Sequence, residues 1–428
     1  MNFNINQASR LNPYSQIMFS ANNCATMPEK IKPITSETQT PNTANRIYDT
    51  NYSYNESVIR KSFEEKSKLK RNSIIINRRI ESLISEAQSQ IEAIFSDTKS
   101  KNNITARVKS EDSIYKKLLR KFKDNELKST EINDCLNAIA DAYGTRMTIK
   151  NLTPEESDKI IATTLKEENS SLTKEDILNY LNGTPSEYND KNQLFEITQK
   201  VINKLKTAQT QEVVDTLIKA ILKKEINITE LNNYGDIISS YFTEEQVHLI
   251  SKAYKSVTNE ALNVVTSTKD GNGRKVSEGS YSEPIIGEYM INNEEKAIKP
   301  SGYATCQMNV VHEFSDKTSG LGEFQIRGSM LDEFANAEHI PYDIRKGKIT
   351  KDDKKYTEIY QTIKGMNEES YNAYNSYLAA IYKWLRLQEL GIKTDKPILK
   401  TFMQNTNCDI PDNIMQKLTM EGLIKTKQ

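Results

Sequence analysis

Cysteine, the residue that builds disulfide frameworks and most structural zinc sites, is scarce in this chain. Among 428 residues there are 4 cysteines and 3 histidines, and no two cysteines form a Cys-x-x-Cys pair. The sequence therefore argues against a structural zinc site and against a disulfide-stabilised fold. This cysteine usage suits a reducing compartment, and we expect a cytoplasmic protein.

A surplus of one charge and long apolar runs are also missing. Lys and Arg together number 58, as do Asp and Glu, so the charge of the whole chain indicates neither a polyanionic nor a cationic partner. No apolar run approaches the roughly 20 residues of a transmembrane helix. The chain also lacks a basic start followed by an apolar core, so no Sec-type signal peptide and no membrane partner are expected.

Residues 1–55 have little charge, no sustained apolar period, and many Asn, Ser, Thr and Pro residues. This composition is typical of a disordered segment. Two interpretations stay open for this predicted leader. It is either a disordered terminus or a secretion leader of a bacterial effector that is delivered into a host cytosol.

Two strands joined by a loop are predicted between residues 303 and 327. Their polar residues fall on alternate positions: Tyr303, Thr305, Gln307 and Asn309 in the first, and Glu323, Gln325 and Arg327 in the second. Apolar residues such as Met308 and Phe324 fall on the positions between. Because a strand sends successive side chains to opposite faces, the pattern predicts a sheet with one polar face. On the pattern alone, a solvated sheet face is the simpler interpretation.

Four sequence motifs indicate a function for the polar face. In chain order they are Arg-x-Lys-x3-Ser-x3-Lys at 107–117, Asp-Ala-Tyr-Gly-Thr-Arg at 141–146, Lys-Pro-Ser-Gly-Tyr at 299–303 with Glu-Phe-Gln-Ile-Arg at 323–327, and Ala-Glu-His at 337–339. Together they resemble the signatures of the RelA/SpoT family, the GTP pyrophosphokinases that make the alarmone ppGpp in the stringent response. The resemblance covers residues near 56–150 and 262–346, about half of the chain.

The resemblance implies a role for each motif. Arg107 would lie against the adenine of ATP, and the phosphates of ATP would bind Lys109, Ser113, Lys117, Arg120 and Arg146. Asp141 and Glu323 would be the catalytic residues and the Mg2+ ligands, with Glu323 alternatively serving as the base beside the acceptor hydroxyl. The acceptor would contact Lys299, Tyr303, Thr305, Gln307, Gln325, Arg327 and His339.

The helix predicted after Ser110 supports the ATP assignment on its own geometry. With a step of about 100° per residue, Lys117 and Arg120 fall within about 40° of Ser113. Ile114 and Leu118 lie on the opposite side. One face thus offers a hydroxyl and two cations to a polyphosphate, although a plain amphipathic helix would show the same stripe.

The expected fold class is α+β, with a nucleotidyltransferase-like mixed β-sheet flanked by helices. The synthetase domain would be discontinuous and comprise residues 56–150 and 262–346. Residues 151–261 would form a large helical insertion that binds a macromolecule, covers the active site or only enlarges the fold. Residues 347–428 would form a helical C-terminal segment whose aromatic stripe packs onto the catalytic domain.

The expected activity is transfer of the β,γ-pyrophosphate of ATP to the 3′-hydroxyl of GDP or GTP. Long family members also carry a hydrolase half with a His-Asp metal site, and no His-Asp dipeptide exists here, so synthesis without degradation is expected. Two departures concern the acceptor side, because Gln307 and Gly328 replace the usual His and Thr. A toxic synthetase acting on adenine nucleotides or the tRNA 3′ end, and a catalytically silent nucleotide- or RNA-binding regulator, therefore stay open. A second copy of the chain or an antitoxin-like regulator stays open as a partner.

Overall fold

The computed structural model describes residues 41–100, 103–139, 141–182, 191–233, 241–265, 290–291, 294–295, 305–345, 347, 349–406, 408 and 410–419. The chain divides into two compact units. The first contains the described residues up to Ile80 together with Lys109–Ala142, and the second contains Glu81–Val108 and Tyr143–Gln428. Residues 1–40 of the predicted leader, and Lys299 and Tyr303 of the predicted acceptor site, lie outside the described residues.

The first unit is helical. It consists of the N-terminal part of α2 (Pro41–Ile94), α3 (Glu111–Lys123) and α4 (Ile132–Asn137). The Oγ of Ser110 accepts the N–H of Ser113 at 3.3 Å and so caps α3, whose buried residues are Ile114 and Leu118, as the apolar stripe predicts. The boundary of the predicted leader was wrong, because α2 already begins at Pro41 and residues 41–55 are helical.

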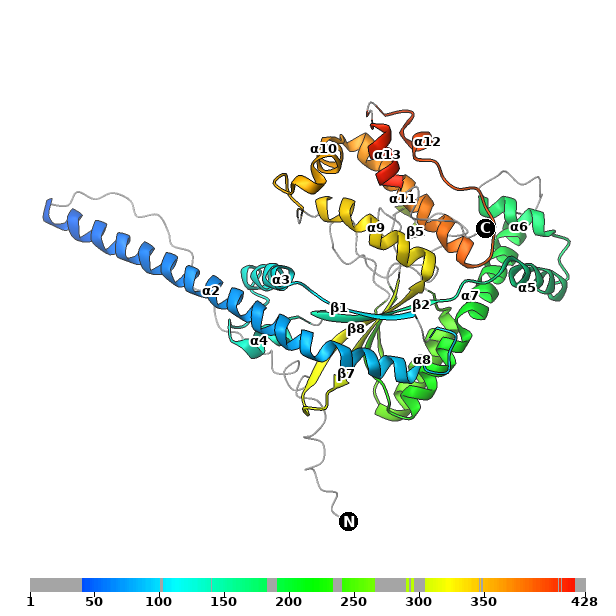
Figure 1. Cartoon of the computed structure of the whole chain (residues 1–428), viewed down its shortest axis with the longest axis horizontal. Coiled ribbons are helices and arrows are strands. Elements are labelled where there is room, and N and C mark those ends of the chain that lie inside the picture. The colour runs from blue at the N-terminus through cyan, green and yellow to red at the C-terminus, as the bar shows by residue number, and fades with distance from the viewer. Residues whose placement is uncertain are drawn as a thin grey trace, which may run out of the picture. The chain divides into compact units, whose positions relative to one another are not determined.

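A six-stranded mixed sheet forms the centre of the second unit (Figure 1). Its order is β1 (Ile104–Val108), β2 (Tyr143–Ile149), β8 (Ser319–Gly328), β7 (Cys306–Glu313), β3 (Asn227–Asn233) and β4 (Asn263–Val265). The pairs β2–β8 and β3–β4 are parallel, and the other three pairs are antiparallel. The strands β5 (Met290–Ile291) and β6 (Glu294–Glu295) pair separately. The predicted α+β class with a mixed sheet is confirmed.

One face of the sheet is apolar and is covered by α7 (Lys191–Leu222), α8 (Glu244–Thr258) and the C-terminal end of α2. The strands contribute Ile104, Met147, Met308, Val310, Phe324 and Ile326 to this core. The helices contribute Ile91, Val214, Leu217 and Ile250, and Phe95 joins them from the turn after α2. Residues 151–261, predicted as a helical insertion, contain a strand as well as helices. This segment contains β3, which pairs with β7, and its helices share the main core.

Two further helices and residues 387–392 of the C-terminal segment form a second core. α5 (Pro154–Glu167) and α6 (Lys174–Asn182) pack with the N-terminal half of α7 and with Leu387, Leu390 and Ile392. Thr153 with Glu156, and Thr243 with Gln246, form the capping boxes that the sequence predicts for α5 and α8.

The C-terminal part of the second unit is a helical cluster. It consists of α9 (Ser329–Arg345), the short helix η3 (Lys354–Tyr356), α10 (Thr357–Gly365), α11 (Glu368–Glu389), α12 (Leu399–Met403) and α13 (Asp412–Thr419). Tyr374, Tyr377 and Tyr382 of α11 are buried in one core with Leu331 and Phe334 of α9. The predicted packing of the aromatic stripe is therefore confirmed, with α9 as its partner. Among the described residues, none of the helices combines the length and apolarity needed to cross a bilayer.

His312 lies on the apolar side of β7, where its position in the strand pattern places it. Its side chain is 2% exposed, and Nδ1 lies 2.9 Å from Oε1 of Gln90. Burial penalises the charged imidazolium and lowers the pKa of His312 from 6.5 to about 4. The residue is thus a neutral structural histidine.

This burial predicts a loss of stability in mild acid. Between pH about 6.5 and about 4 the unfolded chain binds a proton at His312 that the folded chain does not, so falling pH favours unfolding, by about 3 kcal/mol in total. Urea unfolding of wild type and of His312→Phe at pH 7 and pH 4.5 checks this. The variant should lose less stability than wild type on acidification, and an equal loss in both would contradict the assignment.

Candidate functional site

The second face of the sheet is polar, and its residues form rows across the strands. Arg107, Gly144, Glu323, Asn309 and Glu230 are successive partners from β1 to β3. Thr105, Arg146, Gln325 and Gln307 form the neighbouring row. Residues that are adjacent in register and share strand parity point to the same side of a sheet. Residues from three of the four motifs therefore meet on one polar face of the second unit.

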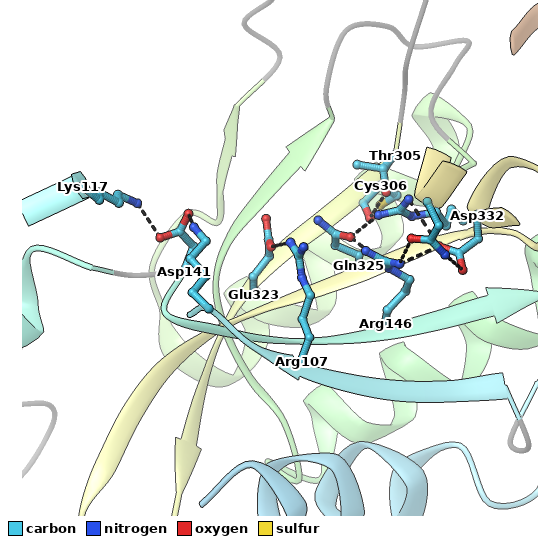
Figure 2. Close-up of polar contacts among 12 residues, drawn as sticks. Arg107, Lys117, Asp141, Arg146, Thr305, Cys306, Glu323, Gln325 and Asp332 are labelled. Carbon is cyan, nitrogen blue, oxygen red and sulfur yellow. Dashed lines mark hydrogen bonds and ion pairs between the residues drawn. The ribbon is translucent and has the colours of Figure 1, made fainter. Parts of the chain in front are cut away.

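Glu323 and Arg107 form an ion pair at the centre of this face (Figure 2). Arg107 Nη2 lies 3.6 Å from Glu323 Oε2. The Glu323 side chain is 11% exposed, whereas Arg107 is 48% exposed. Gly144 lies between them in the row, and a Cβ there would lie 3.1 Å from the Glu323 carbonyl oxygen and 3.6 Å from Oε2. The glycine thus leaves room for the backbone of Glu323, whereas 3.6 Å is an ordinary contact distance for its carboxylate.

A second group of charges joins the sheet to α9. Oδ1 of Asp332, in the first turns of α9, lies 2.8 Å from Arg146 Nη1 and 3.3 Å from Arg327 Nη1. These are charge contacts without aligned hydrogen bonds at Oδ1. Arg146 also donates to Gln325 at 3.3 Å and to Asn336 at 3.0 Å, and Arg327 donates to Gln325. Because Arg327 is only 3% exposed, its guanidinium lies beneath the polar face and holds Gln325 in place.

In the first unit, three further predicted residues come together. Both carboxylate oxygens of Asp141 bind ammonium groups, one from Lys109 and one from Lys117 (Figure 2). Burial of Asp141 acts to raise the pKa of its carboxyl, but the two lysines outweigh it and lower the pKa to about 2. The backbone holds Lys109 in place, because its N–H donates to Ala142 at 2.9 Å and its carbonyl accepts from Asn77 at 2.9 Å. The cluster is an ionised carboxylate with two cations.

The remaining predicted ATP ligands lie along α3. Ser113 is half-buried near the start of the helix, where its hydroxyl meets that of Ser110 at 3.0 Å. Arg120 is exposed in its last turn. Lys117 lies between them and reaches Asp141, so α3 presents the hydroxyl and the cations on the side away from Ile114 and Leu118, as predicted.

The predicted acceptor residues differ in burial and in their hydrogen-bond partners. Gln307 is half-buried on the polar face. Thr305 is buried, and its hydroxyl donates to the carbonyl of Ile326 at 3.3 Å. This side chain therefore stabilises the sheet. His339 is half-exposed on α9 and lies 3.7 Å from Asp343. Its spacing from Asp332 and Asn336 places all three on one side of the helix.

Sequence reasoning missed Asp332, Asn336 and Glu230. The first two carry a weak signal, because they lie seven and three residues before His339 on the same helix side. Glu230 accepts a hydrogen bond from Asn309 at 2.6 Å. Its strand was hidden because an irregularity between Ile228 and Glu230 shifts the register and breaks the alternation of apolar residues.

The carboxylates suit the metal that the resemblance implies. Across the described part of the chain, no group of three or more His, Cys, Asp or Glu side chains could hold a metal ion. Mg2+ usually binds one or two carboxylates and completes its coordination with water and substrate phosphates. The ionised Asp141 and the Glu323 carboxylate each fit such shared coordination by donor type.

The network around Asp332 predicts a large effect of removing its charge. Asp332→Asn should lower the free energy of unfolding by about 2–4 kcal/mol, because it leaves the buried Arg327 without its carboxylate. Urea unfolding with Asp112→Asn as control checks this, since Asp112 pairs with Lys116 on the exposed side of α3. Equal stability of the two variants would show that the network contributes little.

Comparisons with known proteins do not extend the resemblance. No protein-family model matches the chain, and neither a curated protein nor a solved structure matches it. The relation to the RelA/SpoT family therefore stays an expectation from the four motifs.

Proposed function

We propose that this chain is a pyrophosphokinase that transfers the β,γ-pyrophosphate of ATP to the 3′-hydroxyl of GDP or GTP. The observation that carries the proposal is the polar face of the sheet. It gathers Arg107, Arg146 and Glu323 from three motifs far apart in the sequence. The mixed sheet, with α7 and α8 on one face and α9 joined to the other, suits the nucleotidyltransferase-like fold that the resemblance implies.

The first unit supplies groups for the phosphates of ATP. Lys109 and Lys117 hold their ammonium groups beside one carboxylate, so a polyphosphate there would meet two cations already in place. A bound Mg2+ would neutralise phosphate charge, with Asp141 as its protein ligand. The resemblance assigns the adenine ring to Arg107, whose guanidinium is half-exposed.

The second unit supplies the residues for the acceptor. The 3′-oxygen attacks the β-phosphorus of ATP, a new oxygen–phosphorus bond forms, the bond from that phosphorus to the α,β-bridging oxygen breaks, and AMP leaves. Glu323 receives the proton of the attacking hydroxyl. Arg107 stabilises the Glu323 carboxylate until then. Catalysis rests mainly on positioning and on neutralising phosphate charge.

The acceptor is tested directly by transfer of label. The protein is incubated with γ-labelled ATP and Mg2+, and separately with GDP, GTP, ADP, AMP or bulk tRNA. Label on GDP or GTP is expected, and it should disappear in Glu323→Gln. Label only on adenine nucleotides or tRNA would replace the alarmone with a toxic synthetase activity. Nucleotide binding without any transfer would instead favour a silent regulator.

A neighbouring pair of lysines tests the ATP side. Lys117→Ala should raise the KM for ATP about 10–150-fold, because it removes one charge-assisted contact to phosphate, and leave the KM for the acceptor unchanged. Lys116→Ala is the matched control, since Lys116 precedes it on α3 and pairs with Asp112 at 2.8 Å. A selective loss of acceptor affinity in Lys117→Ala would place this helix face on the wrong substrate.

A further inference from the structure

A fully buried carboxylate from the C-terminal tail reaches the junction between β8 and α9. Glu389, the last residue of α11, is 0% exposed. Its Oε1 accepts the backbone N–H of Leu331 at 2.8 Å, and its Oε2 accepts the hydroxyl of Tyr241 at 2.9 Å. Leu331 lies in the first turn of α9, where the backbone N–H groups have no partner within the helix. Glu389 therefore caps α9 from a distant part of the chain.

The space for this carboxylate exists because residue 328 is a glycine. A Cβ built at Gly328 would overlap the carboxyl group of Glu389. Gly328 is a departure from the family pattern on the acceptor side, because the family usually has Thr there. The structure offers another reason for the glycine. The space that a side chain at position 328 would fill is occupied by the carboxyl group of Glu389 from α11.

Several buried polar groups hold Glu389 in this position. Arg386 Nη1 lies 3.5 Å from Glu389 Oε2, donates to Gln209 at 2.6 Å, and its guanidinium lies 4.2 Å from the centre of the Tyr241 ring. The Glu389 carbonyl accepts from Gln209 at 3.2 Å and from the N–H of Leu152 at 2.9 Å. Well-packed apolar residues often replace a buried ion pair at no cost in stability. Stability alone therefore gives little reason to bury this one.

The capped turn leads directly to the polar face. Asp332 follows Leu331 in the chain and reaches Arg146 and Arg327, which lie on two neighbouring strands. A shift of the first turn of α9 would move the Asp332 carboxylate away from both guanidinium groups. Arg327, which donates to Gln325, would then lose its carboxylate partner.

We propose that Glu389 is a positioning residue for the acceptor, acting through the first turn of α9 on Asp332 and, through Asp332, on Arg327 and Gln325. This inference rests on the proposed pyrophosphokinase function. The C-terminal tail is then part of the machinery for the acceptor, and a chain ending before α11 would fold its sheet without an ordered acceptor side.

Two variants and a control test the inference in the full-length protein. Glu389→Ala removes the cap, whereas Glu389→Gln keeps an oxygen that accepts the Leu331 N–H. Tyr374→Phe is the control, because it removes one buried hydroxyl from the same helix and keeps the ring. Hydrogen–deuterium exchange over residues 329–336 reports on the turn, and steady-state kinetics with ATP and GDP report on the positions of the substrates.

In Glu389→Ala we expect exchange over residues 329–336 to accelerate about ten- to hundredfold. The KM for GDP should rise about tenfold or more, and by more than the KM for ATP, because Arg327 and Gln325 are the predicted acceptor residues of this group. Glu389→Gln should recover most of both properties, and Tyr374→Phe should match wild type. A purely structural role would instead lower kcat in proportion to the folded fraction and change neither KM, and that result would overturn the inference.

A stability measurement keeps the test decisive if Glu389→Ala folds poorly. Gly328→Ala should lower the urea midpoint in wild type, because its methyl group meets the Glu389 carboxylate. The same change should cost much less in a Glu389→Ala background, and equal costs in the two backgrounds would overturn the contact. If wild type transfers label to no acceptor, the proposed function fails, whereas unchanged exchange in Glu389→Ala alongside normal wild-type transfer overturns only this inference.

Discussion

The parallel pairing of β2 with β8 is the constraint on which the polar face depends. It joins residues that are far apart in the chain, so that Gly144 lies opposite Glu323 and Arg146 opposite Gln325. A slip of one residue in this pairing would turn Glu323 and Gln325 toward the apolar core. Phe324 and Ile326, packed against that core, oppose such a slip. Burial of the apolar face therefore fixes the register of the strands, and the register determines which polar residues lie together on the other face.

Balanced charge is the second requirement of this face, because buried ions must be paired. Arg107 faces Glu323, while Arg146 and Arg327 share Asp332. The carboxylate for the second group comes from a helix, as Asp332 of α9. The start of α9 is thus as important to the site as the strands are, and Glu389 holds that start in place.

Segments that the sequence set apart from the predicted synthetase domain are integral to the fold of the second unit. The region 151–261 supplies β3 and two helices of the main core, and the tail supplies the cap of α9. Contacts of this kind, between distant segments, produce little signal in the local sequence pattern. The sequence reveals the apolar residues of the 32-residue helix α7. It does not reveal that the two halves of this helix pack into two different cores.

The sequence by itself determined the local features of this protein. Strand alternation placed Glu323, Gln325 and Arg327 on one face, helical periodicity placed Lys117 and Leu118 on different sides of a helix, and strand parity placed His312 in the core. The tertiary structure alone decided that Glu230 joins the polar face, that Asp332 pairs with two arginines, and that Glu389 fills the space above Gly328. The physical reason is that periodicity depends on neighbours along the chain. The partner of a strand or of a buried charge depends on segments that the sequence order does not bring together.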